Sequence, residues 1–323
     1  MNIHLNYKLR KNFYELIINN NISCILIAIS GGQDSICLIQ LIEKLSKDTA
    51  KQILIQFIYI DHQWKDSSKA QIQHIINYFK CYNKVIIIYQ IKKLTYSETE
   101  ARKIRYQIIN HHAIKYNVSL IITGHTVTDK IETFLQKLLR GTSIDGATSL
   151  TYYRYLSKKI IIWRPLLNIS RHEINWFYRH SCLPVWSDIT NYYYNINRNR
   201  IRHELMPYFK NYFCVNIEHN INSFLNISYI DNEYIKQNTI KIYLLSRHKY
   251  NIAINYKIII SQHLAIQQRI LQLFFYNNFH QSIEKKMLKK LLSLIYQSVN
   301  KYNKILWQNK KIYIYNIWLY VAI

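Results

Sequence analysis

Two adjacent glycines, Gly31 and Gly32, constrain the fold more than any other feature of this chain. The 323-residue sequence contains only five glycines. The run 24–29 before the pair is apolar and rich in β-branched residues, which indicates a buried strand, and residues 36–45 show the apolar spacing of a helix. The pair therefore lies on a strand-to-helix turn, where a backbone without Cβ atoms can approach a phosphate closely.

Strands and helices alternate over the first part of the chain. Strands are predicted at 24–29, 53–60, 84–91 and 119–123, and helices at 36–45, 67–79, 97–116 and 128–139. This order predicts an α/β fold with a doubly wound, Rossmann-like parallel sheet, whose ligands bind at the carboxyl ends of the strands.

The amino-acid composition changes near residue 211, where Asn, Tyr, Ile and Lys become dominant. A helical stretch is predicted near 265–298 and a hairpin near 304–321. We therefore predict two domains, a catalytic domain at 1–210 and a smaller, partly helical C-terminal domain at 211–323.

Basic residues are in large excess. Lys and Arg number 43 and Asp and Glu 18, which gives a formal net charge of +25. A folded chain with this charge is typical of proteins that bind a polyanion, and nucleic acid is the first candidate. Abundant Ile, Asn, Lys and Tyr also indicate AT-rich coding DNA, so compositional drift is the alternative explanation of the excess.

The sequence argues against membrane, secreted and metal-scaffold classes. Its apolar runs are far shorter than the roughly 18 residues of a membrane-spanning helix, so no membrane association is predicted. The first twenty residues lack the apolar segment of a signal peptide, which predicts that the protein is not secreted. The five cysteines are scattered without a C-x-x-C pair and are predicted to be small core residues: Cys24, Cys37, Cys81, Cys182 and Cys214.

Three segments carry candidate chemistry, and the first is "SGGQDS" at 30–35. Its glycines allow backbone N–H groups to approach a phosphate, the following helix adds its positive dipole end, and Ser30 and Ser35 add hydroxyl donors. No Lys-Ser or Lys-Thr pair follows, so this is not the loop of γ-phosphate-transferring NTPases. The alternative is an ordinary strand-to-helix turn.

The second segment runs from Thr123 to Gly146, and its Gly124 ends a predicted strand. His125 lies at the carboxyl end of that strand, and Asp129 and Glu132 follow three residues apart on one face of a helix. An imidazole and two carboxylates near a phosphate loop could bind a metal and a cationic amine, or move a proton. The alternative is that the acidic residues only stabilise the helix dipole.

The third segment runs from residue 164 to 207. A turn at Pro165 leads to a helix with Ser170 and Glu173 as a capping box, and an acidic, Asn-bearing turn is predicted at 188–191. Three arginines, spaced two residues apart, then suit phosphate binding: Arg198, Arg200 and Arg202. The alternative is a solvated helix face.

The first segment resembles the pyrophosphate-binding loop of the N-type ATP pyrophosphatases, the PP-loop superfamily, which split ATP into AMP and pyrophosphate. The resemblance implies that Asp34 holds Mg²⁺ and that the loop residues bind ATP: Ser30, Gly31, Gly32, Gln33, Asp34 and Ser35. Across residues 25–207 the order of motifs is similar to the tRNA(Ile)-lysidine synthase family: "SGGQDS", "EARKIRY", the GH…D…ET…LLRG…DG block, "RPLL", "LP" and the D-x-T-N…RN-x-x-R…P tail.

This resemblance implies an ATP-dependent ligase. Family members adenylate the C2 oxygen of the wobble cytidine of tRNA(Ile) with a CAU anticodon. L-lysine then displaces AMP, and the modified cytidine changes the codon that the tRNA decodes from AUG to AUA.

The implied site residues come from the same resemblance. His125, Asp129 and Glu132 would hold lysine, and Asp129 would share Mg²⁺ with Asp34. Arg102 or Arg105 would face the phosphates or the adenylated base, and the sequence leaves that choice open. The third segment's arginines, Arg198, Arg200 and Arg202, would bind tRNA.

Some departures and alternatives remain. Thr128 stands where many family members have a second acidic residue, and residues 60–68 differ from the usual His-Gly-Leu-Arg run. The nearest alternative is a PP-loop tRNA thiolation enzyme, which would need reactive or cluster-binding cysteines. A small-molecule amidating synthetase would not need the basic charge, and a non-enzymatic RNA-binding module would not need the phosphate loop.

The setting of the protein follows from its composition. AT-rich coding predicts a plastid-encoded protein of the chloroplast stroma or a cytoplasmic protein of a reduced-genome bacterium. The sequence leaves the choice between monomer and homodimer open.

Overall fold

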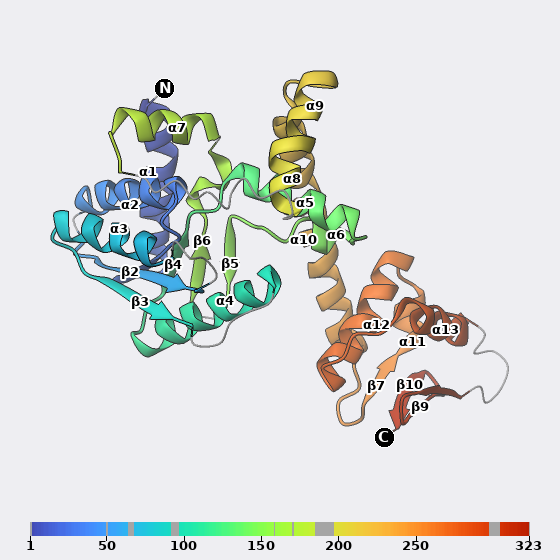
Figure 1. Cartoon of the computed structure of the whole chain (residues 1–323). Coiled ribbons are helices and arrows are strands. Elements are labelled where there is room, and N and C mark those ends of the chain that lie inside the picture. The colour runs from blue at the N-terminus through green and yellow to red at the C-terminus, as the bar shows by residue number, and fades with distance from the viewer. Residues whose placement is uncertain are drawn as a thin grey trace. The chain divides into compact units, whose positions relative to one another are not determined.

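The computed structural model describes residues 2–49, 51–63, 68–91, 97–157, 159–169, 171–184, 197–296 and 304–322. The chain divides into two compact units, Met1–Leu225 and Asn226–Ile323, shown in Figure 1. The division falls inside one long helix, α10 (Ile217–Ser246), which begins shortly after the predicted boundary at 210/211. The predicted cap at Ser170, the turn at 188–191 and part of the segment 60–68 lie outside the described residues.

The first unit contains a six-stranded sheet. Its strands stand in the order β3 (Ile86–Gln90), β2 (Leu54–Asp61), β1 (Cys24–Ile29), β4 (Leu120–Thr123), β6 (Ile161–Trp163) and β5 (Tyr153–Tyr155). All neighbouring pairs are parallel except β5 with β6. The predicted doubly wound sheet is confirmed, and β5 and β6 extend it beyond the prediction.

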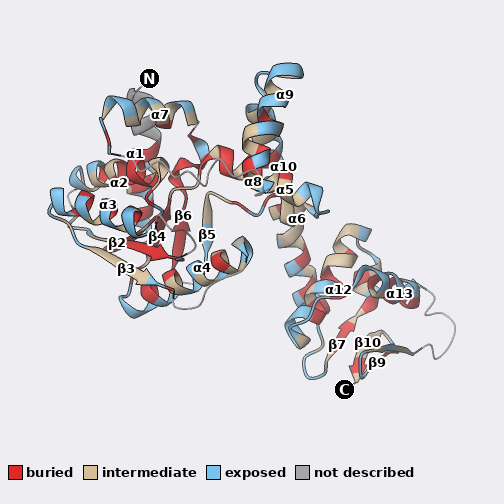
Figure 2. Ribbon diagram, viewed as in Figure 1, coloured by how far each residue is buried: buried red, intermediate tan, exposed pale blue. Residues whose placement is uncertain are grey.

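Helices cover both faces of this sheet (Figure 1). One face packs against α1 (Asn2–Asn19), α2 (Gln33–Lys47), α3 (Ser68–Cys81) and α7 (Arg171–His180), and the other against α4 (Glu98–Lys115). Ile25 and Ile27 of β1 face the first core, whereas Leu26 faces the core under α4. This alternation follows from the two-residue period of a strand, and Figure 2 shows buried residues in the inner strands β2, β4 and β6.

A separate helical cluster stands beside the sheet in the same unit. It comprises α5 (Val127–Leu139), α6 (Ile144–Ala147), the 3-10 turn η1 (Pro165–Asn168), α8 (Asn197–Arg200), the π-helical turn η3 (Ile201–Leu205), α9 (Met206–Tyr212) and the start of α10. Ile131 and Leu135 of α5 form a small core with Ile201 and Met206. Burial of these apolar side chains holds α5 against α8 and η3.

The second unit has its own core and a four-stranded antiparallel sheet. The strand order is β7 (Ala253–Asn255), β10 (Trp318–Ala322), β9 (Lys310–Tyr315) and β8 (Ile305–Trp307), and the remaining helices are α11 (Tyr256–Ile260), α12 (Leu264–Phe279) and α13 (Lys285–Tyr296). The single helix predicted near 265–298 is therefore two helices, because His280 ends α12 in the left-handed conformation with φ 53°. The predicted hairpin has a third strand.

Two further predictions concern the burial of the cysteines and the absence of membrane-spanning helices. Cys24 and Cys37 are buried, but Cys81 and Cys182 are exposed, so the prediction of core cysteines is wrong for the latter two. Among the described helices, none has the length and apolar character needed to cross a membrane.

Candidate active site

The turn after β1 requires glycine at position 31. Gly31 has φ +78°, and a Cβ built on it would lie 2.9 Å from both the Gln71 amide nitrogen and the Ile75 Cδ1. The Gln71 amide donates to the Ser30 carbonyl at 3.1 Å, so α3 holds the turn in place. Both the backbone conformation and the close packing therefore disfavour a larger residue.

The start of α2 presents backbone and hydroxyl donors to an anion. Its N-cap is Gly32, which has no side chain to cap the first-turn N–H groups. The Ser35 hydroxyl donates to the Gly32 carbonyl at 2.8 Å and lies 3.3 Å from the Ser30 hydroxyl oxygen. Gln33 points elsewhere, because its amide donates to Asn175 on α7 at 2.5 Å. Backbone amides, hydroxyls and the helix dipole are the groups with which a turn of this kind can bind a phosphate.

Asp34 stands in the first turn of α2 beside this anion site. Burial raises the pKa of Asp34 to about 6, and the negative charge of Asp129 acts in the same direction. Arg171 and Arg202 act in the opposite direction. A cation bound next to Asp34 would favour its ionised form, since opposite charge lowers the pKa of a carboxyl group.

The neighbouring strand β4 brings His125 to the same edge of the sheet. Gly124 packs against the turn, since a Cβ on it would lie 3.5 Å from backbone atoms of Asp34 and Ser35. The His125 Nδ1 lies 2.9 Å from the Thr123 hydroxyl. Burial lowers the pKa of His125 to about 3, against the opposing charge of Asp129. The imidazole is therefore uncharged at neutral pH.

Asp129 has two tasks at the start of α5. Its Oδ2 accepts from the Thr126 backbone N–H at 2.8 Å, and the Thr126 hydroxyl accepts from the Asp129 N–H, so the two residues form a capping box. Its Oδ1 accepts from the Arg198 Nη2 at 2.5 Å. Asp129 therefore caps α5 with one oxygen and pairs with Arg198 through the other.

Glu132 is fully buried between two guanidinium groups. Its oxygens accept from the Nε of Arg198 and the Nε of Arg202, each at 2.6 Å. Burial acts to raise the pKa of Asp129, but Arg198 and the weaker attraction of Arg202 contribute to a pKa below its usual value. Two carboxylates therefore balance the charge of two guanidinium groups in one ion cluster, which comprises Asp129, Glu132, Arg198 and Arg202.

The structure places the three predicted RNA-binding arginines on two sides of one helical segment. Arg198 and Arg202 point to the carboxylates of α5. Arg200 points away from them and pairs with Glu204 at 3.1 Å on the exposed side.

The two candidate arginines of α4 also diverge. The Arg102 guanidinium lies 5.7 Å from the centre of the Tyr106 ring and is among the charges that lower the pKa of His125. The Arg105 Nη2 lies 3.1 Å from the His62 Nε2, beyond the end of β2. Burial, followed by the charge of Arg105, lowers the pKa of His62 to about 4. Arg102 and Arg105 therefore belong to different environments.

Arg164 is a candidate that the sequence reasoning did not include. It follows β6 and is 1% exposed, with Nη1 donating to the Thr151 carbonyl at 2.8 Å and Nη2 3.5 Å from the Tyr106 hydroxyl. No carboxylate pairs with it in the part of the chain that the structure describes. A charged residue directly after the apolar run 160–163 was the available signal, because it stands at the carboxyl end of a strand.

Magnesium fits this site only with help from the nucleotide. The described residues contain no group of three or more His, Cys, Asp and Glu side chains arranged for a metal ion. Asp34 stands in the first turn of α2, whereas both oxygens of Asp129 already accept hydrogen bonds. Mg²⁺ commonly takes one or two carboxylates together with substrate phosphates, so one carboxylate beside a phosphate site is consistent with it.

Comparison with known proteins defines the class of this site. Residues 3–209 match the family model of the PP-loop domain, so the chain is a PP-loop protein, an enzyme class that uses ATP. It is 49% identical to the chloroplastic tRNA(Ile)-lysidine synthase of Gracilaria tenuistipitata var. liui, over 92% of each chain. It is 35% identical to the same enzyme of Pyropia yezoensis, over 90% of this chain and 89% of that protein. The chain belongs to the tRNA(Ile)-lysidine synthase family.

Solved structures support the fold. The U34-tRNA thiolase NcsA from Methanococcus maripaludis matches with a TM-score of 0.54 and 16% identity, over 69% of this chain and 78% of that one. At this identity the likeness concerns the fold alone.

Proposed function

We propose that this protein ligates L-lysine to C2 of the wobble cytidine in tRNA(Ile) with a CAU anticodon, using ATP and releasing AMP and pyrophosphate. The observation that carries the proposal is the meeting of two chain segments at one sheet edge. The phosphate-binding turn after β1 lies against Gly124 after β4, next to His125 and the carboxylates of α5. The names of the two relatives support the same reaction.

The first step transfers the adenylyl group. The C2 oxygen of the cytidine forms a bond to the α-phosphorus of ATP, and the bond from that phosphorus to the leaving pyrophosphate breaks. The turn at 30–35 would hold the pyrophosphate portion, and Asp34 would hold Mg²⁺, which supplies positive charge to the phosphates. We propose that Arg102 and Arg164 also stabilise the negative charge of the phosphates. Both guanidinium groups lie close enough to His125 to lower its pKa, and His125 stands beside the turn.

The second step forms the carbon–nitrogen bond. The lysine ε-amine attacks C2, the C2–O bond breaks, AMP departs with the bonding electrons, and the amine loses a proton. Asp129 and Glu132 would attract the cationic amino acid once Arg198 and Arg202 move aside, because these guanidinium groups occupy both carboxylates in the unliganded structure. Uncharged His125 would not repel an ammonium group.

The RNA would be held by dispersed basic residues. Of the three predicted arginines, we keep Arg200 as an RNA contact and assign Arg198 and Arg202 to the carboxylates, because of their ion pairs. In the second unit, α13 exposes four lysines along one side: Lys285, Lys286, Lys289 and Lys290. Such a row suits contact with a phosphate backbone. We therefore assign tRNA contacts to the C-terminal domain.

We further propose that the protein works in a chloroplast stroma, as the chloroplastic relatives suggest, or in bacterial cytoplasm. The alternative activity, tRNA thiolation, is supported only by a shared fold. The sequence has no C-x-x-C pair to serve as redox or cluster ligands.

The test is transfer of labelled lysine to unmodified CAU-anticodon tRNA(Ile) in the presence of ATP and Mg²⁺. We expect label in the tRNA and one AMP per lysine, and no label in a tRNA with uridine at the wobble position. AMP formation supported equally well by another amine, with no lysine in the tRNA, would reject the proposal.

A further inference from the structure

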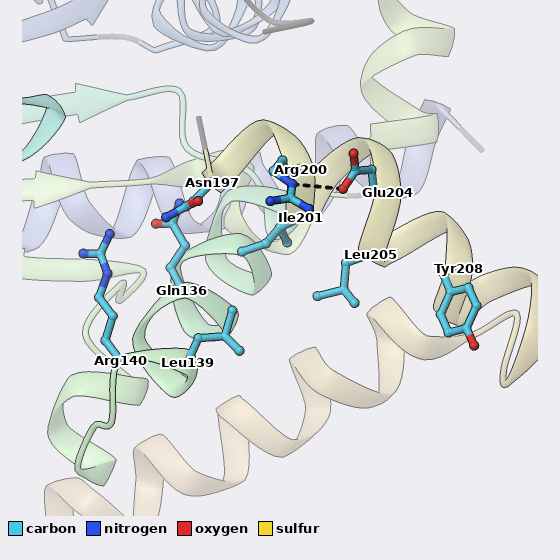
Figure 3. Close-up of a pocket in the computed structure, with 9 residues that line it drawn as sticks. All are labelled: Gln136, Leu139, Arg140, Asn197, Arg200, Ile201, Glu204, Leu205 and Tyr208. Atoms are coloured by element: carbon cyan, nitrogen blue, oxygen red, sulfur yellow. Dashed lines mark hydrogen bonds and ion pairs between the residues drawn. The ribbon is translucent and has the colours of Figure 1, made fainter. Parts of the chain in front are cut away.

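We propose that a groove between α5 and the segment α8–α9 binds one unstacked base of the anticodon loop, next to the cytidine that reacts. The inference rests on the proposed function, since it names a second contact of the same RNA. The groove has a volume of about 680 Å³, within the usual range of small-ligand sites. Figure 3 shows its two walls, with Gln136 and Leu139 on α5 and Leu205 and Tyr208 on the opposite side.

The groove adjoins the candidate active site through both of its walls. Gln136 follows Glu132 by four residues, so it lies one helical turn, about 5.4 Å, further along α5. On the opposite wall, Arg198 and Arg202 face the carboxylates while the neighbouring stripe, Arg200 and Glu204, faces the groove. A strand of RNA whose cytidine reaches the carboxylates would thus pass the groove with an adjacent nucleotide.

The groove offers polar groups suited to a nucleotide. The side-chain amides of Gln136 and Asn197 can both donate to and accept from a base edge. Arg140, at the end of α5, is exposed and has no ion-pair partner among the described residues. The Nε of Arg200 donates to Glu204 at 3.1 Å, which orients this guanidinium and leaves its terminal N–H groups available. Two guanidinium groups against one carboxylate favour an anionic ligand.

An aromatic cluster continues from one end of the groove. The Tyr208 ring lies 5.0 Å from the ring of Tyr212 and 5.7 Å from that of Phe213. These three side chains are 51%, 74% and 70% exposed. Exposed aromatic rings beside arginines are typical of proteins that stack unpaired bases, and stacking accepts any base because every base has an aromatic face.

The charge of the groove and of the chain selects RNA over an acyl chain or an apolar helix. Leu139 and Leu205 make the two walls partly apolar, but Arg140 and Arg200 also line the groove, in a chain of net charge +25. A purely apolar partner would leave the Arg140 guanidinium without compensation, whereas Arg200 already pairs with Glu204. A nucleotide provides an apolar ring face and a phosphate within one ligand.

The test measures binding of a fluorescent anticodon stem-loop RNA to the full chain, without ATP or lysine. We expect Tyr208→Ala to weaken binding about 5- to 100-fold, and Tyr208→Phe to remain within about twofold, because the phenyl ring still stacks. Tyr82→Ala is the matched control, since Tyr82 is 44% exposed, lies 4.9 Å from the Tyr78 ring, and does not line the groove. This control should leave binding unchanged.

A second set of RNAs tests the base itself. Each loop nucleotide is replaced in turn by an abasic residue, and one such RNA, altered beside the wobble position, should bind wild type and Tyr208→Ala equally weakly. Arg140→Gln should reduce the slope of log affinity against log salt by about 0.7, as loss of one single-strand phosphate contact does. Lys80→Gln, on an exposed part of α3, should leave the slope unchanged.

Several outcomes would overturn the inference. These are no binding by wild type, no effect of Tyr208→Ala, or an equal effect on every abasic RNA. Loss of a dimer in sedimentation with unchanged RNA affinity would instead identify a second copy as the occupant. Lysine transfer by wild type is measured separately, so absence of transfer rejects the proposed function while the Tyr208 result still decides the groove.

Discussion

Replacement of Glu132 by glutamine tests the buried ion cluster directly. Glu132→Gln keeps the shape of the side chain but leaves the guanidinium groups of Arg198 and Arg202 facing Asp129 alone. Removal of one partner from a buried ion pair costs about 3–5 kcal/mol. Because the two arginine side chains are 25% and 21% exposed, and glutamine can still accept a hydrogen bond, we expect the lower value, about 3 kcal/mol.

The assay is thermal unfolding of the full chain in the absence of ligands. For a unit of about this size, 1 kcal/mol shifts the Tm by roughly 2–4 °C, so the first transition should fall by about 6–12 °C. Glu204→Gln is the matched control, since its carboxylate pairs with Arg200 at the surface, and such a pair contributes about 0.3–0.5 kcal/mol.

Equal shifts for Glu132→Gln and Glu204→Gln would refute the reasoning. They would mean that Glu132 is not held in an ion cluster and is free to bind an ammonium group in the unliganded protein. Arg198→Met combined with Glu132→Gln adds a second check, because the loss of stability should be less than the sum of the single losses.

Three further predictions concern the phosphate turn and its surroundings. Gly31→Ala should destabilise the first unit by about 1–3 kcal/mol and reduce ATP binding, measured by melting and calorimetry, whereas Gly32→Ala, with φ −80° and no close neighbour, should change stability much less. The pKa of Asp34 is raised to about 6, so in the ligand-free protein its contribution to stability should fall as pH rises from about 3.8 to 6. Asp34→Asn should remove that part of the pH dependence of Tm. An unchanged profile would contradict the burial of the Asp34 carboxyl group. Arg164→Gln should lower kcat about 100-fold and leave tRNA affinity within twofold. Arg164→Lys should not restore kcat, because an ammonium group cannot reproduce the two directed contacts of the guanidinium. Restored activity in Arg164→Lys would show that only the charge matters.

The regular elements of the first unit were predictable because their patterns are local. The predicted strand 24–29 coincides with β1, and each predicted strand and helix of this unit overlaps an observed one. Strands β5 and β6 have three residues each, too short to show a two-residue period, and neither was predicted. Helix α10 was also not predicted, because Asn, Lys and Tyr interrupt the apolar spacing of its sequence.

Scarce glycine did not mark every position that needs a left-handed backbone. Of the five glycines, only Gly31 and Gly141 have positive φ. Eight described residues of other types also have positive φ: Asn21, Gln63, Asn83, Asn117, Cys182, His280, Gln308 and Asn316. Asparagine tolerates this conformation better than most residues, so an Asn-rich chain can end helices and form turns without glycine.

The sequence by itself determined the order of strands and helices, the glycine turn between β1 and α2 and the family, because each depends on residue types at short, regular spacing. Only the tertiary structure decided which charges meet. Arg198 pairs with Glu132 across 66 positions of sequence, and Arg164 approaches Tyr106 across 58. Such pairs depend on how α5 packs against α8 and how β6 lies beside β4, and these arrangements follow from burial of apolar faces over the whole unit. Local spacing carries no information about them.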